Sequence, residues 1–329
     1  MKLDNYILVI NEKNKVNNFK EDICLYGIGK IIQLIYDDIK RQKSREIIKL
    51  IESLGIKYQT LYSWKTDYNP IAISKLNKLL LLWKKECGKT QEEKDKIWER
   101  IYLENKGYSQ NGQKKILLPR ELDEKIGYLI GFFQGDGHLK KEGGSFQENS
   151  LYFYESNIEM INRLNKIIEE TFAIRGKVYR GKNKRGYKWY VLRICSKPVY
   201  FFFRNILRLQ SGRKTRNIEV PEIIKKSELS IQLSFIRGFF DAEGTIGENK
   251  KGPWLDIGQA SKDVPCEILI WIQKKLDEIG INLSTPRRTQ NQEFFRIRTA
   301  KRESIKRFFE VISSDHPNKI KRFNSVIKR

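Results

Sequence analysis

The sequence is poor in the residues that metal clusters and disulfide frameworks require. Its 329 residues include only two histidines and four cysteines. The cysteines are far apart and form no CxxC pair: Cys24, Cys87, Cys195 and Cys266. This spacing argues against a structural zinc site and against a disulfide framework, and two histidines are too few for a cluster of histidine ligands.

Long apolar runs are missing as well. No stretch approaches about 18 uninterrupted apolar residues, so we expect no transmembrane helix and no membrane partner. The first five residues, MKLDN, lack the apolar core of a signal peptide. We therefore expect an intracellular location, which would be the cytoplasm of a prokaryote, in association with the nucleoid, or an organelle if the gene is organelle-encoded.

Positive charge, in contrast, is abundant. The chain has 64 lysines and arginines against 40 aspartates and glutamates, which gives a net charge of +24. Hydrophobic residues make up 40% of the chain, a share typical of globular domains. So large a positive balance indicates a polyanionic partner, first of all nucleic acid, because lysine and arginine bind phosphates. Residues 1–115 carry +8 and the remainder carries +16, so both parts are candidates for this contact.

One segment of the first third, residues 47–64, resembles a helix-turn-helix. Gly55 would form the turn, and Leu61 and Trp64 would lie on the inner face of the second helix. The outer face would then present to a DNA groove Lys57, Gln59, Thr60 and Ser63. A helical hairpin without any role in nucleic-acid binding has the same pattern, so that alternative stays open.

The rest of the chain contains an internal repeat. Residues Gly127–Gly137 (GYLIGFFQGDG) resemble Ser234–Gly244 (SFIRGFFDAEG), 107 residues later. A β-rich stretch, an amphipathic helix, further strands and a closing helix follow each copy, which predicts an αββαββα unit used twice. The expected organisation is a small all-α domain over 1–104, a linker over 105–116, a first repeat over 117–220 and a second repeat over 221–329.

Small residues recur four positions apart in both copies, and on a helix such residues share one face. The predicted helix–helix interface consists of Gly127, Gly131, Ser234 and Gly238. Two helices packed along these stripes would bring Asp136 and Glu243 together at their C-terminal ends. Two carboxylates repel each other there and face the unfavourable end of the helix dipole, and a divalent cation with hard oxygen ligands would remove both penalties.

The two blocks resemble the paired signature of the LAGLIDADG homing endonucleases in their single-chain, two-repeat form. The resemblance covers about residues 117–329 and implies a duplicated α+β fold with two saddle-like antiparallel sheets in the DNA major groove. It also implies that Asp136 and Glu243 are catalytic metal ligands, with Gly135 and Ala242 as further metal contacts and Mg²⁺, or Mn²⁺, as the cofactor. Asp241 is expected to matter less, since its counterpart is Gln134.

Two further groups of residues follow from this resemblance. Lys214 and Lys319 occupy matching closing loops and are candidates for stabilising negative charge, with Lys321 as a rival. The expected DNA contacts, chosen because arginine and glutamine read base edges and lysine holds phosphates, are Tyr179, Arg180, Lys182, Lys184, Arg185, Lys188, Tyr190, Arg193, Arg287, Arg288, Gln290, Gln292, Arg296 and Arg298. The histidines His138 and His316 are expected to have no role.

The function predicted from these residues is site-specific, metal-dependent cleavage of double-stranded DNA by a monomer, which would make a staggered double-strand break at a long, asymmetric target. Two alternatives remain at this point. One is a transcription regulator that keeps the fold without cutting, and the other is a maturase that binds its host intron RNA.

Overall fold

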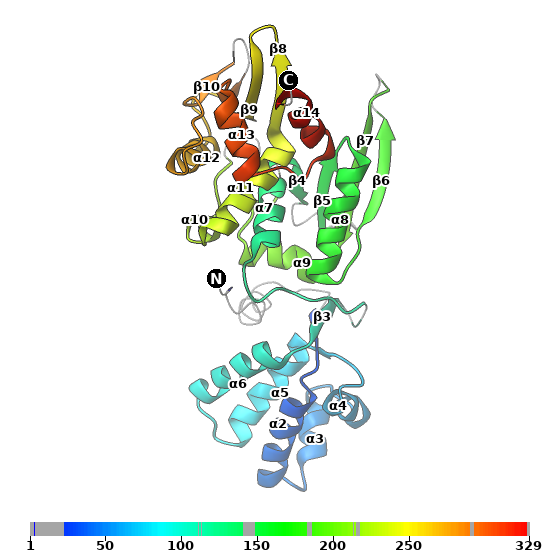
Figure 1. Ribbon diagram of the computed structural model, residues 1–329. Helices are drawn as coiled ribbons and strands as arrows, with labels where there is room; N and C mark the ends of the chain where they lie inside the picture. Colours follow the sequence, from blue (N-terminus) through cyan, green and yellow to red (C-terminus); the bar gives the residue numbers. More distant parts are fainter. Residues whose placement is uncertain are drawn as a thin grey trace. The chain divides into compact units, whose positions relative to one another are not determined.

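The computed structural model describes residues 3, 23–110, 112, 114–140, 149–182, 186–212, 214, 218–289 and 293–327 (Figure 1). Its contacts divide the chain into two compact units. The larger unit comprises Glu121–Cys195 and Leu207–Arg329, and the smaller unit comprises Leu3–Arg120 and Ser196–Ile206. No helix of the described part is long and apolar enough to cross a membrane.

The smaller unit combines helices with a short sheet. Its elements are β1 (Ile23–Tyr26), α2 (Gly29–Gln42), α3 (Ile47–Ser53), α4 (Tyr58–Lys65), β2 (Ile71–Ala72), α5 (Ile73–Glu86), α6 (Gln91–Glu104), β3 (Gly107–Gln110), α9 (Lys197–Phe201) and the π-helical turn η1 (Phe202–Ile206). The three strands form one antiparallel sheet in the order β2-β1-β3. The expectation of an all-α domain is therefore wrong.

The expected linker over 105–116 is wrong for the same reason. Residues 107–110 form β3, which pairs with β1 along its whole length, and the side chains of Tyr108 and Ser109 are buried. The glycine, serine and asparagine content suggested a loop, but Asn105 instead donates a hydrogen bond to the Tyr108 hydroxyl at 2.7 Å. Tertiary contacts outweigh local propensity here, which is common in short strands.

The larger unit contains the predicted duplication, except that the closing helix expected in the first copy, α9 with η1, is grouped with the smaller unit. The first repeat contains α7 (Glu124–Asp136), β4 (Gly137–Leu139), β5 (Ser150–Glu155), α8 (Ile158–Phe172), β6 (Lys177–Lys182) and β7 (Lys188–Cys195). After α10 (Glu222–Lys225), the second repeat contains α11 (Leu229–Glu243), β8 (Gly244–Asn249), β9 (Gly252–Ala260), α12 (Glu267–Glu278), β10 (Arg287–Arg288), β11 (Phe294–Thr299), α13 (Arg302–Val311) and α14 (Pro317–Ile327). The sheets have equivalent strand orders, β4-β5-β7-β6 and β8-β9-β11-β10.

Helices α7 and α11 pack against each other at the centre of this unit (Figure 1). A Cβ atom on Gly131 would lie 2.0 Å from the carbonyl oxygen of Phe235, and one on Gly238 would lie 2.1 Å from that of Tyr128. A Cβ atom on Gly127 would meet the carbonyl oxygen of Ile231 at 2.8 Å. Each glycine therefore allows backbone to approach backbone at a distance that no side chain would permit.

Candidate functional site

Asp136 and Glu243 are the last residues of α7 and α11. The close packing of the helices continues to these ends, since a Cβ atom on Gly135 would lie 2.5 Å from Ala242 Cβ and 2.9 Å from Glu243 Cγ. The two repeats therefore bring their equivalent carboxylates to one place. Asp136 also borders a hollow of about 390 Å³ whose lining includes Glu155, His316 and Lys319.

Neither carboxylate is neutralised by a partner within the described part of the chain: Asp136 and Glu243 make no hydrogen bond and no ion pair with it. Burial, followed by the charges of Glu243 and Glu155, raises the pKa of Asp136 to about 7. Burial also raises the pKa of Glu243 above its usual range. Two desolvated carboxylates without partners are a costly arrangement that a bound cation would relieve.

Two partly buried lysines hold the C-terminal ends of these helices in the same way. Lys214 Nζ donates hydrogen bonds to two carbonyl oxygens in the last turn of α7, one of them at 3.2 Å. Lys319 Nζ donates to two carbonyl oxygens in the last turn of α11, at 2.5 and 2.8 Å. The accepting residues are Phe133 and Gln134 in α7, and Phe240 and Asp241 in α11. A cation at this end of a helix also complements its dipole.

The structure thus brings the predicted lysines to the predicted carboxylates. Burial lowers the pKa of Lys214 to about 7 and that of Lys319 to about 8, although the carboxylates Asp136 and Glu243 act in the opposite direction on both. Lys321, the rival candidate, is exposed to solvent. Its position two residues along α14 points it away from the helix end that Lys319 holds.

The donor set is suited to a hard divalent cation, provided that other ligands complete it. No group of three or more histidine, cysteine, aspartate or glutamate side chains in the described ranges is arranged to hold a metal. Mg²⁺ needs fewer protein ligands, because it usually retains several waters and binds through one or two carboxylates and substrate phosphates. Asp136 and Glu243 meet that requirement, with the main chain of Gly135 and Ala242 beside them.

Sequence reasoning missed a third carboxylate at this site. Glu155 ends β5, and its side chain, only 8% exposed, lies 3.5 Å from His316 Nε2, so His316 is also part of the site. The equivalent position in the second repeat is Gln259, because Phe153 pairs with Gly137 as Ile257 pairs with Gly244. Gln259 Oε1 is buried without a hydrogen-bond partner in the described structure. The sequence does contain a signal for Glu155 and Gln259: each is a polar residue at the end of a strand face that is otherwise apolar.

Asp241 was expected to matter less than Asp136 and Glu243, but its side chain is part of a buried hydrogen-bond network. Its buried carboxylate accepts hydrogen bonds from Tyr128 Oη at 2.9 Å, from Asp315 N at 2.8 Å and from Ser314 Oγ. These bonds tie the segment before α14 to α11 and so place Lys319. The counterpart Gln134 makes a single bond of this kind in the first repeat, where its Nε2 donates to the carbonyl oxygen of Glu219 at 2.7 Å.

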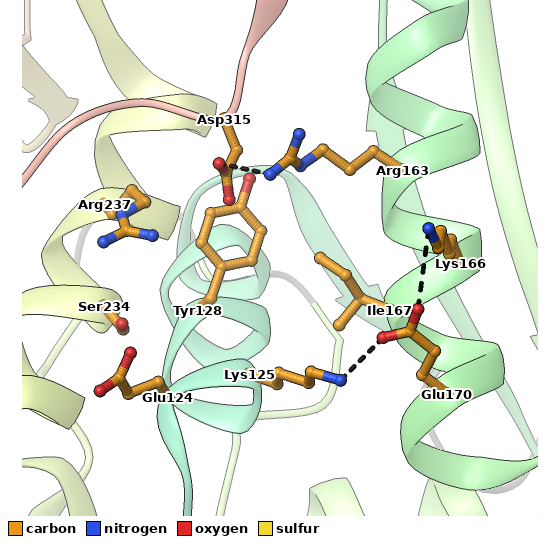
Figure 2. A pocket seen from close by; sticks show the side chains of 10 residues that line it. All are labelled: Glu124, Lys125, Tyr128, Arg163, Lys166, Ile167, Glu170, Ser234, Arg237 and Asp315. Carbon is orange, nitrogen blue, oxygen red and sulfur yellow. Dashed lines mark hydrogen bonds and ion pairs between the residues drawn. The ribbon is translucent and has the colours of Figure 1, made fainter.

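A second cavity, of about 360 Å³, lies between α7, α8 and α11 (Figure 2). Two ion pairs line it: Arg163 contacts Asp315 at 2.5 Å, and Lys125 contacts Glu170 at 2.7 Å. The Arg163–Asp315 pair adds to the bonds of Asp241 in fixing the segment before α14. The residues of this cavity therefore help to position the site, and we do not assign a second site to the cavity.

The strand register of the first repeat assigns the predicted DNA contacts to two different faces. Tyr179 and Arg193 lie on the face opposite the helices, whereas the buried Leu192 and Phe153 mark the face that packs on them. On the face of Leu192 fall Arg180, Lys182, Lys188 and Tyr190. The open face also carries residues that sequence reasoning missed: Tyr152, Tyr154, Lys177 and Trp189, with His138 beside Tyr152.

The second repeat presents a similar open face. Arg287, Arg296 and Arg298 lie on it, whereas Arg288 pairs with the buried Phe295 on the other face. The guanidinium of Arg298 stacks over Trp254, 4.4 Å from the ring centroid. Arg296 also contacts Asp256 at 3.3 Å. Four predicted contacts, Lys184, Arg185, Gln290 and Gln292, lie outside the described residues.

Comparison with known proteins identifies the duplicated unit. The sequence profile of the LAGLIDADG-like domain matches twice, over residues 123–207 and 230–313. The chain is similar to homing endonuclease I-ApeI of Aeropyrum pernix, with 27% identity over 56% of this chain and 85% of that protein. It is also similar to the tRNA-splicing ligase RtcB of Pyrococcus furiosus, with 30% identity over 64% of this chain but only 23% of that ligase. Among solved structures, I-DmoI in complex with DNA and Mn aligns with a TM-score of 0.41, 22% identity and coverage of 60% of this chain and 99% of that one.

Proposed function

The chain belongs to the LAGLIDADG family of homing endonucleases, and from this premise we propose that it is itself an active, site-specific DNA endonuclease. The observation that carries the proposal is the pair of carboxylates Asp136 and Glu243, brought together at two packed helix ends with no partner among the described residues. A protein that only bound DNA would have no need of this destabilising pair. The product would be a staggered double-strand break at a long, asymmetric target, made by a monomer, since one chain contains both repeats.

The roles of the residues follow from their placement. Asp136 and Glu243 would hold a divalent cation, Mg²⁺ or Mn²⁺, between the repeats. When bound, such a cation activates water and stabilises charge on the scissile phosphate. Lys214 and Lys319 keep the two helix ends in place and, when protonated, place positive charge beside the carboxylates. That charge would attract a phosphate to the site and stabilise the negative charge that develops on its oxygens.

The open faces of the two sheets would receive the DNA. Arginines on these faces lie over aromatic rings, as with Arg298 over Trp254 and Arg193 over Tyr152, at 4.4 and 5.9 Å from the ring centroids. Arginine presented in this way reads guanine edges and binds phosphates. The net charge of +24 supports binding to such a polyanion.

The proposal is tested by cleavage of a plasmid that contains the uninterrupted insertion site of the host gene. We expect the purified chain to linearise it in Mg²⁺ or Mn²⁺, to leave it intact in EDTA, and to produce staggered ends when the cuts are mapped on each strand. Binding of this plasmid without any cleavage in either metal would contradict the proposal and favour a non-cleaving regulator. Preferential binding to the host intron RNA would favour a maturase.

A further inference from the structure

We propose that the smaller unit has a DNA-binding surface of its own, formed by α4, that reads the major groove of duplex DNA. Helices α3 and α4 are joined by a short turn at Gly55, whose φ of +70° is readily available only to glycine. The second helix of such a pair is the one that enters a groove in helix-turn-helix proteins. This surface is separate from the proposed nuclease site. The inference depends on the proposed function only in that both take DNA as the bound polymer.

The side chains at α4 are divided between an anchoring face and a free face. Leu61 and Trp64 are 0% and 7% exposed and fix the helix to the core of the unit. Lys57, Gln59 and Thr60 are exposed. Lys57 and Gln59 make no hydrogen bond and no ion pair through their side chains with any residue of the described chain. The helix thus presents polar groups whose hydrogen-bonding capacity the described residues of the unit leave unused.

Aromatic surface lies beside these polar groups. The rings of Tyr58 and Tyr62 are 42% and 57% exposed on the same helix, and Tyr68, just beyond its end, is 83% exposed. Tyrosine combines an apolar ring with a polar hydroxyl group, so tyrosines exposed together at one helix can give a partner both kinds of contact. Next to a phosphodiester backbone, their hydroxyl groups donate to phosphate oxygens while their rings cover the sugars.

Charge within the unit is distributed to favour a polyanion at α4. The segment 53–66, which contains the turn and α4, has no aspartate or glutamate. Acidic residues are concentrated on α6 instead: Glu92, Glu93, Asp95, Glu99 and Glu104. Lys57 immediately precedes α4, where no side chain caps the free N–H groups, so the helix start adds the positive end of its dipole to the lysine charge.

Duplex DNA is the polymer that fits this surface. The major groove of B-form DNA admits an α-helix, whereas the major groove of A-form RNA is too narrow and deep for side chains to read. A glutamine at the start of the helix reads adenine through two hydrogen bonds, and a lysine beside it binds a phosphate. Gln59 is therefore assigned to a base and Lys57 to the backbone.

The experiment selects binding sites from a random library of long DNA duplexes with the full chain, in Ca²⁺ to permit binding without turnover. The wild type is expected to recover a motif with two separate blocks, and Gln59→Ala is expected to lose one block while the other stays unchanged. On the selected duplex, fluorescence anisotropy should show a loss of affinity of at least about fivefold for Gln59→Ala. Lys57→Ala should reduce the slope of log K against log salt by about one.

The control is Lys96→Ala on α6, which removes the same charge from an exposed position in the acidic part of the unit. It should change neither the motif nor the salt slope. An identical motif for wild type and Gln59→Ala, or tighter binding of the same sequence as duplex RNA, would overturn the inference. The binding result does not depend on turnover. If the plasmid assay in Mg²⁺ showed no cleavage, the proposed nuclease activity would be refuted, but the binding data would still test the role of α4.

Discussion

Replacement of Gly131 by alanine is the sharpest test of the way in which the two repeats build the site. The added Cβ atom would lie 2.0 Å from the carbonyl oxygen of Phe235 and 2.9 Å from the amide nitrogen of Phe239. Both are backbone atoms of α11, so no side-chain rotation can relieve the overlap. The helices must separate by more than about 1 Å to restore an ordinary contact distance.

The expected magnitude is the balance of two terms. Overpacking of a well-packed interface costs about 1–3 kcal/mol, and contact with backbone places this variant at the upper end of that range. Alanine recovers about 1 kcal/mol of helix propensity relative to glycine. We therefore expect Gly131→Ala to lower the free energy of unfolding by about 2 kcal/mol. Separation of the helix ends would also misplace Asp136 and Glu243, and a displacement of about 1 Å can cost about a hundredfold in rate.

The assays are urea denaturation followed by circular dichroism, and the rate of plasmid linearisation in Mg²⁺ at a temperature where the variant is fully folded. Ser230→Ala, on the exposed surface of α11, is the matched control and should stay within about 0.5 kcal/mol of the wild type. Wild-type stability together with a wild-type cleavage rate in Gly131→Ala would refute the account of the helix interface.

Three further predictions follow from the site. Asp241→Ala removes the carboxylate that accepts from Tyr128 Oη, Ser314 Oγ and Asp315 N, and should lower the free energy of unfolding by about 3 kcal/mol in urea denaturation. A loss below about 1 kcal/mol would contradict the role assigned to this carboxylate. Lys319→Met should slow linearisation by at least about tenfold, whereas the equally sized charge removal in the exposed Lys321→Met should not, and equal effects of the two would contradict the assignment. The pKa of Asp136 is raised in the folded state to about 7, so its contribution to the stability of the metal-free protein is present below about pH 4 and is lost as the pH rises towards 7. Asp136→Asn should therefore have a higher melting temperature than the wild type in EDTA at about pH 8 but not at about pH 4, and the same difference at both pH values would count against this reasoning.

The sequence was sufficient to predict those parts of the site that lie in repeated motifs or whose residue spacing determines their position on a helix. Two blocks with small residues four positions apart predicted the helix pair, because helical periodicity alone places such residues on one face. The pairing of Lys214 with Lys319 could likewise be inferred from matching basic segments. The segment around Lys319 is the first turn of α14 and not the loop expected, but both lysines lie at the helix ends.

Long-range pairing was beyond the reach of sequence reasoning. Glu155 and His316 are 161 positions apart, and only the packing of both repeats brings them together. Strand β3 looks like a linker in isolation, since its burial depends on pairing with β1. The division of strand residues between two faces depends on register, and a shift of one residue would reverse it. For this reason Tyr152 and Trp189 were overlooked while Arg180 was included.

The central claim, that one carboxylate from each repeat forms a shared metal-dependent centre for DNA cleavage, is tested most directly by the single variants Asp136→Asn and Glu243→Gln. Each keeps the size of the side chain and removes the charge that would hold the cation. The measurement is the rate of plasmid linearisation at saturating Mg²⁺, with DNA affinity measured in parallel. The account predicts a fall of at least about a hundredfold in the rate for either variant, with DNA affinity retained. Cleavage of both strands at the wild-type rate by either variant would contradict it.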